Sequence, residues 1–194
     1  MFSDLLHHLD THESMGPGGI HPRVLRELAE VLTKPLSIIY QQSWLTREVP
    51  VDWRLANVMP IHKKGWKEDP GNYRTVSLTS VPGKVMEQII LSTITWHVQD
   101  NQVIRPSQHG FMKGLSCLTN LISFYDKVTH LVDEGKAVHV VYLDFSKAFD
   151  TVSHSILLEK LAAHGLDGHM LRWLKAWLGG QAQRVVVNGV KSRW

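Results

Sequence analysis

A short run of β-branched and aromatic residues, Val138 to Leu143, constrains the fold of this chain more than any other feature. Gly135 precedes the run, Asp144 follows it, and His139 alone interrupts its apolar character. A brief apolar stretch without polar alternation is typical of a strand that is covered on both faces. We therefore expect a buried central strand here. It places the carboxylate of Asp144 at its carboxyl end, where α/β folds hold ligand-contacting groups.

Segments with a helical spacing of apolar residues lie on both sides of this strand. They cover residues 3–9, 21–45, 81–103, 115–132, 153–164 and 167–178. We expect a break at Pro35, because proline removes a backbone donor from a helix interior. Leu55–Ile61 and Tyr73–Leu78 alternate as strands do. The helices at 81–103 and 115–132 are expected to pack on a sheet, so the pattern predicts an α+β fold.

A β-hairpin is predicted close to Trp194. Gln183 to Val187 is a strand-like stretch that leads into Asn188-Gly189. Both of these residues tolerate the positive φ angles of a tight turn. The returning strand has only Val190 to Trp194 available, and we therefore expect the natural domain to continue past Trp194.

Composition narrows the classes of function. No apolar run approaches the ~20 residues that cross a bilayer, and the first ten residues lack the basic-then-apolar order of a secretory signal. We expect a cytoplasmic or nuclear protein that is neither secreted nor membrane-spanning. Cys117 is the only cysteine and the 12 histidines are scattered, which argues against a Cys- or His-based metal site. A net charge of +3 fits a nucleic-acid partner only weakly.

Several single residues have two interpretations. Asp144 either holds a metal ion or caps the next turn through its side-chain oxygen. Phe149 is either functional or a core aromatic, and Asp150 is either functional or the cap of the helix near residue 153. His109 is expected to be structural, and Cys117 is expected to be a small core residue.

Basic residues gather between the two predicted strands at 55–61 and 73–78. The segment contains Arg54, His62, Lys63, Lys64, Lys67 and Arg74, interleaved with Trp53, Trp66 and Tyr73. Lys and Arg on a hairpin-like pair of strands can grip phosphates, and nearby aromatic rings can stack on bases. The alternative is an ordinary solvated hairpin tip, since Glu68 and Asp69 dilute the positive charge.

Five motifs, taken in order, resemble the reverse-transcriptase domain of non-LTR (LINE-type) retrotransposons, closest to the chicken-repeat and jockey group. They are Gly16–Pro22, Trp53–Gly65, Asn72–Leu78, Gln108–Phe111 and Leu143–Asp150. The resemblance spans nearly the whole chain. It implies a right-hand polymerase fold, with the fingers and supporting helices at about residues 14–135 and the first part of the palm at about residues 136–194.

The same resemblance implies an RNA-directed DNA polymerase, which extends a DNA primer on an RNA template with dNTP and Mg²⁺. By this resemblance Asp144 would be the catalytic, metal-binding aspartate, and the backbone carbonyl of Phe145 would contact a metal ion. Lys147 and Ala148 would offer backbone N–H groups to the triphosphate. Phe149 would be the steric gate beneath the incoming sugar.

In the fingers, the resemblance implies that Lys63, Lys64 and Arg74 hold the nucleotide phosphates and the template. The chain departs from the family at Gly18, where Asp is usual, and at Thr75, where Pro is usual. It also lacks the family's Ala-Asp-Asp and Pro-Gln-Gly segments. Because a two-metal site needs several carboxylates, we expect this chain to be catalytically incomplete by itself. A residual nucleic-acid-binding module and a non-functional retrotransposon relic are the alternatives.

Overall fold

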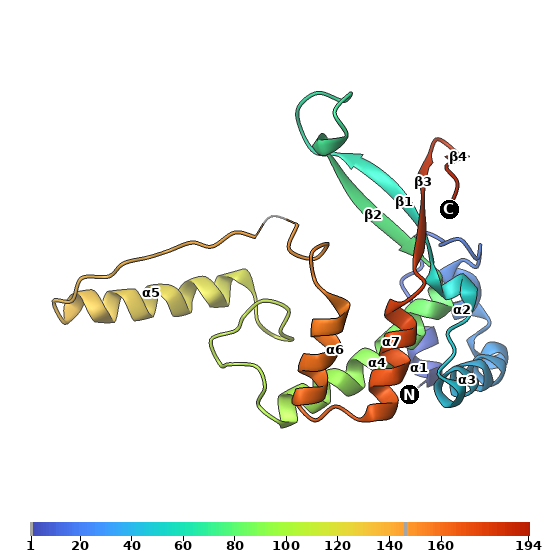
Figure 1. Cartoon of the computed structure of the whole chain (residues 1–194), viewed down its shortest axis with the longest axis horizontal. Helices are drawn as coiled ribbons and strands as arrows, with labels where there is room; N and C mark the ends of the chain where they lie inside the picture. The colour runs from blue at the N-terminus through green and yellow to red at the C-terminus, as the bar shows by residue number, and fades with distance from the viewer. Residues whose placement is uncertain (1, 146) are drawn as a thin grey trace. The chain divides into compact units, whose positions relative to one another are not determined.

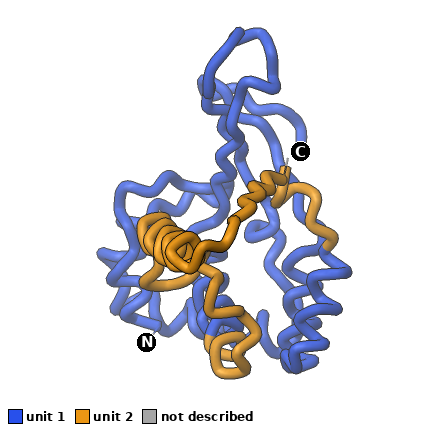
Figure 2. Tube along the Cα trace, turned by 90° about the vertical axis from the view of Figure 1, so that its left-hand side faces the viewer, with its two compact units in different colours: residues 1–95, 154–194 blue, residues 96–153 orange. Residues whose placement is uncertain are grey.

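The computed structural model of the chain describes residues 2–145 and 147–194 and contains both helices and a four-stranded sheet (Figure 1). The predicted α+β class is confirmed. The chain divides into two compact units, coloured separately in Figure 2. Unit 1 combines residues 1–95 with residues 154–194, and unit 2 consists of residues 96–153.

Three helices open unit 1: α1 (Phe2–His7), α2 (Pro22–Glu27) and α3 (Ala29–Thr46). The expected break at Pro35 is wrong, because the helical path is interrupted at Leu28 (φ −102°, ψ 20°) and Pro35 lies inside α3. Buried Ala29 and Tyr40, one on each side of Pro35, hold α3 against the core. Packing of these neighbours therefore outweighs the lost backbone hydrogen bond at Pro35.

The sheet of unit 1 has the order β2-β1-β3-β4. Its strands are β1 (Leu55–His62), β2 (Tyr73–Thr79), β3 (Ala182–Val187) and β4 (Val190–Lys191). β1 is antiparallel to β2 and parallel to β3. Asn188 and Gly189 have φ values of 49° and 81°, which confirms the predicted hairpin between β3 and β4. Short 3-10 turns, η1 (Val51–Arg54) and η2 (Pro70–Asn72), flank β1 and β2.

The remaining helices of unit 1 are α6 (His154–Ala163), α7 (Gly168–Leu178) and most of α4 (Val81–Asp100). One apolar cluster joins α1, α2, α3, α4 and α7, and it includes Leu6, Leu25, Tyr40, Val85 and Trp173. Two hydrogen bonds tie distant segments together within this cluster. The Tyr40 hydroxyl donates to the Pro82 carbonyl (2.9 Å), and the Trp173 indole N–H donates to Ser43 Oγ (3.2 Å).

Unit 2 contains α5 (Cys117–Asp133). A capping box starts this helix, since Ser116 Oγ accepts from the Thr119 N–H and Thr119 Oγ1 accepts from the Ser116 N–H. None of the residues of α5 is buried, so the expected packing of this helix on a sheet is wrong. Cys117 is exposed, and its expected core position is wrong for the same reason.

The segment from Val138 to Leu143 also differs from the prediction. It has no regular secondary structure, and Val141 and Tyr142 are 77% and 84% exposed. A strand exists through hydrogen bonds to a neighbouring strand, and no strand in the described part of the chain pairs with these residues. The expected buried central strand is therefore wrong.

Candidate nucleotide and nucleic-acid site

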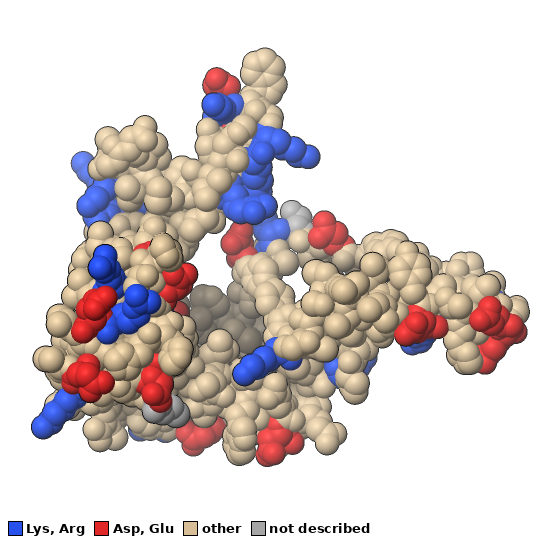
Figure 3. Space-filling view, turned by 180° about the vertical axis from the view of Figure 1, so that it is seen from behind, with Lys and Arg blue, Asp and Glu red and all other residues tan. Residues whose placement is uncertain are grey.

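The β1–β2 hairpin of unit 1 carries the basic segment. Lys63, Lys64, Lys67 and Arg74 are all exposed on it, and Figure 3 shows Lys and Arg side chains following the hairpin at the top of the view. Arg74 is paired with Ile61 in the antiparallel register, which places it beside the end of β1 where Lys63 and Lys64 follow. Three predicted residues, Lys63, Lys64 and Arg74, are thus brought together.

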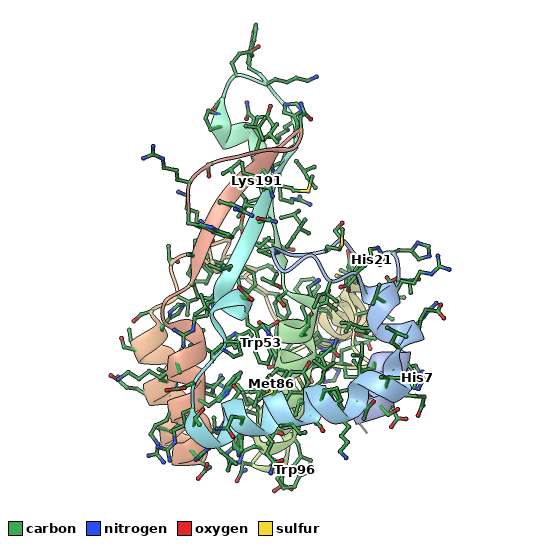
Figure 4. The ribbon with its side chains drawn as sticks, turned by 90° about the vertical axis from the view of Figure 1, so that its right-hand side faces the viewer. His7, His21, Trp53, Met86, Trp96 and Lys191 are labelled. Atoms are coloured by element: carbon green, nitrogen blue, oxygen red, sulfur yellow. The ribbon has the colours of Figure 1, made fainter. Side chains whose placement is uncertain are left out.

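Four residues of the basic segment and its interleaved aromatics have structural roles. The rings of His62 and Tyr73 pack edge-on across the two strands, with centroids 5.3 Å apart. Arg54 is half-buried and lies beside Gly180, where an added Cβ would sit 3.1 Å from its Nη1 atom. Trp53 belongs to the core, and Figure 4 shows it where β1 leaves the helices, above Met86. Arg54 and Trp53 are therefore part of the base of the hairpin, and its tip carries the free cations.

The second group of predicted residues lies in unit 2. Asp144, Phe145, Lys147, Ala148 and Phe149 are exposed. Ser146, which stands between them, lies outside the described residues. Lys147 has a φ of 52°, and its carbonyl accepts hydrogen bonds from the N–H and the hydroxyl of Thr151 (3.2 and 3.1 Å). A compact turn therefore follows Asp144.

The structure also bears on the interpretations of Phe149 as a core aromatic, Asp150 as a helix cap and His109 as a structural residue. Phe149 is 76% exposed, so its interpretation as a core aromatic is wrong; its ring packs edge-on against Phe111, with centroids 5.8 Å apart. α6 begins at His154, so the residue at its N-cap position is Ser153 and not Asp150. The expected structural role of His109 is confirmed, since its Nδ1 atom lies 3.1 Å from Thr119 Oγ1 at the start of α5.

The predicted metal site around Asp144 has few protein ligands. In the part of the chain that the structure describes, no three His, Cys, Asp or Glu side chains are grouped so that they could hold a metal ion. The donors at the predicted corner are one exposed carboxylate, from Asp144, and the carbonyl of Phe145. Such a donor set fits a Mg²⁺ ion that takes most of its ligands from water and substrate phosphates.

None of the described helices is both long and apolar enough to span a bilayer.

Arg184, a further cation on the sheet, was not predicted from the sequence. Arg184 of β3 donates from Nε to Asn57 Oδ1 of β1 (2.9 Å), and its guanidinium lies 4.1 Å from the centre of the Trp194 ring. The pairing of Asn57 with Arg184 depends on the parallel contact between β1 and β3. Local sequence patterns carry no signal for a contact over that separation.

Unit 1 also has an apolar cavity of about 530 Å³ between α4 and α7. Glu87, Ile90, Trp173 and Trp177 are among its lining residues. Burial raises the pKa of Glu87, and the hydrogen bond from Trp177 partly offsets this effect. None of the residues predicted for the nucleotide site lines this cavity.

Comparison with known proteins identifies the family. The sequence profile described as reverse transcriptase (RNA-dependent DNA polymerase) matches residues 61–193. One similar protein is the probable RNA-directed DNA polymerase from transposon BS of Drosophila melanogaster, with 28% identity over 127 residues, which is 65% of this chain and 14% of the relative. Another is the RNA-directed DNA polymerase from mobile element jockey of the same species, with 26% identity over 190 residues, which is 97% of this chain and 21% of the relative. A third is the Pol polyprotein of the type-1 retrotransposable element R2 of Popillia japonica (29% over 123 residues, 63% and 17%).

The chain spans about a fifth or less of the length of these relatives. The profile match covers more than half of the chain and includes both groups of predicted residues, the hairpin tip from Ile61 onward and the turn after Asp144. The chain therefore belongs to the reverse transcriptase family, and it is a partial reverse-transcriptase region of the kind found in non-LTR retrotransposons.

Proposed function

We propose that this chain forms the fingers (residues 14–135) and the first part of the palm (residues 136–194) of an RNA-directed DNA polymerase. In this proposal the β1–β2 hairpin holds the RNA template and the phosphates of the incoming dNTP. The observation that carries it is the group of exposed cations Lys63, Lys64 and Arg74 at the end of one hairpin, in a chain of the reverse transcriptase family.

The hairpin is suited to phosphate contacts for a physical reason. Lys63, Lys64 and Lys67 are exposed and close in sequence, and none of them forms an ion pair in the described residues. An unpaired surface ammonium group can approach a phosphate without first breaking a salt bridge. Asp69 lies in the same loop, but its carboxylate accepts the Gly71 N–H (2.8 Å) and helps to form η2.

We propose that the turn after Asp144, within unit 2, is a second nucleotide-binding element of the chain. The Asp144 carboxylate and the Phe145 carbonyl would hold Mg²⁺. The positive charge of this ion would stabilise the negative charge on the phosphate oxygens during nucleotide transfer. The Lys147 and Ala148 N–H groups would receive triphosphate oxygens. The exposed ring of Phe149 would exclude a 2′-hydroxyl by contact with the sugar.

Catalysis needs more carboxylates than this turn provides. Two metal ions about 4 Å apart require several acidic ligands to balance their charge, and no such group occurs in the described residues. We therefore propose that the chain binds nucleic acid but does not extend a primer on its own. A residual nucleic-acid-binding module is the second candidate function, and the same exposed cations support it.

Binding of a labelled single-stranded RNA at several salt concentrations tests the proposal. Changing Lys63, Lys64 and Arg74 together to Ala is expected to weaken binding and to lower the salt slope by about 0.7 for each lost phosphate contact. The matched control changes Arg23, Lys34 and Lys160 to Ala; these residues are exposed and lie on α2, α3 and α6. Equal binding by both triple variants would refute the proposal for the hairpin.

A primer-extension assay on an RNA template with Mg²⁺ tests the second part. No extension by the isolated chain is expected, for the reason given above. Extension that disappears in Asp144→Ala would show that the chain assembles a complete active site and would contradict the proposed incompleteness.

A further inference from the structure

The loop at the end of the β1–β2 hairpin presents an aromatic ring, that of Trp66, which is largely exposed to solvent. Trp66 is 82% exposed, whereas Trp53 and Trp173 are 6% and 1% exposed in the core. An indole ring in water forgoes a large burial energy, so its position at the tip of a hairpin requires an explanation. We propose that Trp66 is a stacking platform for a base of single-stranded RNA, and this inference rests on the proposed function of the hairpin.

The backbone around Trp66 is held by hydrogen bonds to side chains of β1, η2 and β2. The carbonyl of Gly65 lies 3.1 Å from His62 Nε2, the carbonyl of Trp66 accepts from Asn72 Nδ2 (3.0 Å), and the carbonyl of Lys67 accepts from the Tyr73 hydroxyl (2.8 Å). Three successive carbonyls are therefore held by side chains at the base of the loop. A loop that is already ordered loses less conformational entropy when it binds a ligand.

Gly65 makes this arrangement possible. Its φ is 86°, and an added Cβ would lie 2.7 Å from the Asn72 Nδ2 atom. A larger residue would displace Asn72, whose side chain holds the Trp66 carbonyl. The backbone is thus fixed while the indole ring remains free, which is the arrangement that stacking requires.

The charges around the ring select the kind of ligand. Lys63, Lys64 and Lys67 lie within four positions of Trp66 and are exposed. A planar apolar ring among cations complements a polymer that alternates planar bases with phosphates. Base faces are accessible in a single strand and hidden in a duplex, so the structure assigns the ring to an unpaired base.

The test compares two labelled RNA oligonucleotides of equal length and charge, one of uridines and one with abasic sites in the centre. Trp66→Ala is expected to weaken binding of the uridine oligonucleotide by about 5- to 150-fold, the range for loss of one stacked base. It is expected to have little effect on the abasic oligonucleotide. Trp66→Tyr should restore most of the affinity, and the salt slope should stay unchanged because no cation is lost.

Trp96→Ala is the matched control, since Trp96 is 66% exposed and lies on α4 away from the hairpin sequence. Each alternative outcome is distinguishable. Wild-type binding that depends on salt but is insensitive to Trp66→Ala would overturn the stacking role alone. Equal losses on both oligonucleotides would also overturn it. Absence of any salt-dependent RNA binding by the wild type would overturn the proposed function itself. Preferential binding of the wild type to vesicles with anionic lipids, lost in Trp66→Ala, would assign the ring to a membrane surface instead.

Discussion

The hydrogen bond between Trp173 and Ser43 offers a direct test of how unit 1 is held together. The indole N–H of Trp173 donates to Ser43 Oγ (3.2 Å), and the two residues are 1% and 5% exposed. Ser43→Ala leaves the indole N–H buried without an acceptor, which costs about 1–3 kcal/mol. Thermal unfolding followed by near-UV circular dichroism should show a Tm lower by about 2–4 °C per kcal/mol for a chain of this size.

A double-mutant cycle isolates this hydrogen bond from other effects. Ser43→Ala combined with Trp173→Phe removes both partners, so the combined loss should be smaller than the sum of the single losses by about 1 kcal/mol. Ser37→Ala is the control, because Ser37 is exposed on the same helix. Strictly additive losses, or a Tm of Ser43→Ala equal to that of Ser37→Ala, would refute the reasoning.

Three other predictions concern stability. Gly16→Ala should destabilise unit 1 by about 1–3 kcal/mol or more, because the new Cβ would lie 2.1 Å from the Thr79 carbonyl oxygen. Gly18→Ala is the control and should be tolerated in urea unfolding, because its Cβ would meet no atom closer than 3.9 Å. Glu87→Gln should raise the Tm at pH 7 and not at pH 4. Burial raises the pKa of Glu87, so its ionisation lowers the stability of the folded chain as pH rises above 4.5. A Tm difference that stays constant between pH 4 and pH 7 would contradict the raised pKa of Glu87. Asp167→Ala should lower the Tm at neutral pH, because backbone hydrogen bonds from Met170 and His169 lower the pKa of this carboxylate at the start of α7. The stabilisation by the carboxylate is fully present above its ordinary pKa of 3.8 and is lost as pH falls through the lowered pKa. The Tm difference between the variant and the wild type should therefore shrink in a series of measurements toward pH 2.

Local chemistry decided which elements were predictable. Asn188-Gly189 specifies its turn without help from the rest of the chain, because both residues adopt positive φ at low cost. The β1 and β2 strands were predicted for a similar reason, since each alternates over a short segment bounded by turn residues. The exposure of Lys63, Lys64 and Arg74 followed from the same hairpin.

Packing decided the rest. The apolar composition of residues 138–143 indicates strand propensity, but only a partner strand in space converts propensity into a ladder. Pro35 is accommodated inside α3 because Ala29 and Tyr40 are anchored in the core, which a proline count does not reveal. The interpretation of Cys117 failed because helical periodicity predicts an apolar face and not what covers that face. The roles assigned to Asp144 and the residues after it stay predictions, which the experiments above can test.

The division of unit 1 into two stretches of sequence has a consequence for synthesis. Arg184 is synthesised 127 positions after Asn57, its hydrogen-bond partner, so β1 cannot pair with β3 until then. At ribosomal rates of about 5–20 residues per second, that interval is about 6–25 s. Trp53 likewise has no contact with Trp177 until α7 has been synthesised, so part of the apolar core stays exposed on the nascent chain for most of this interval.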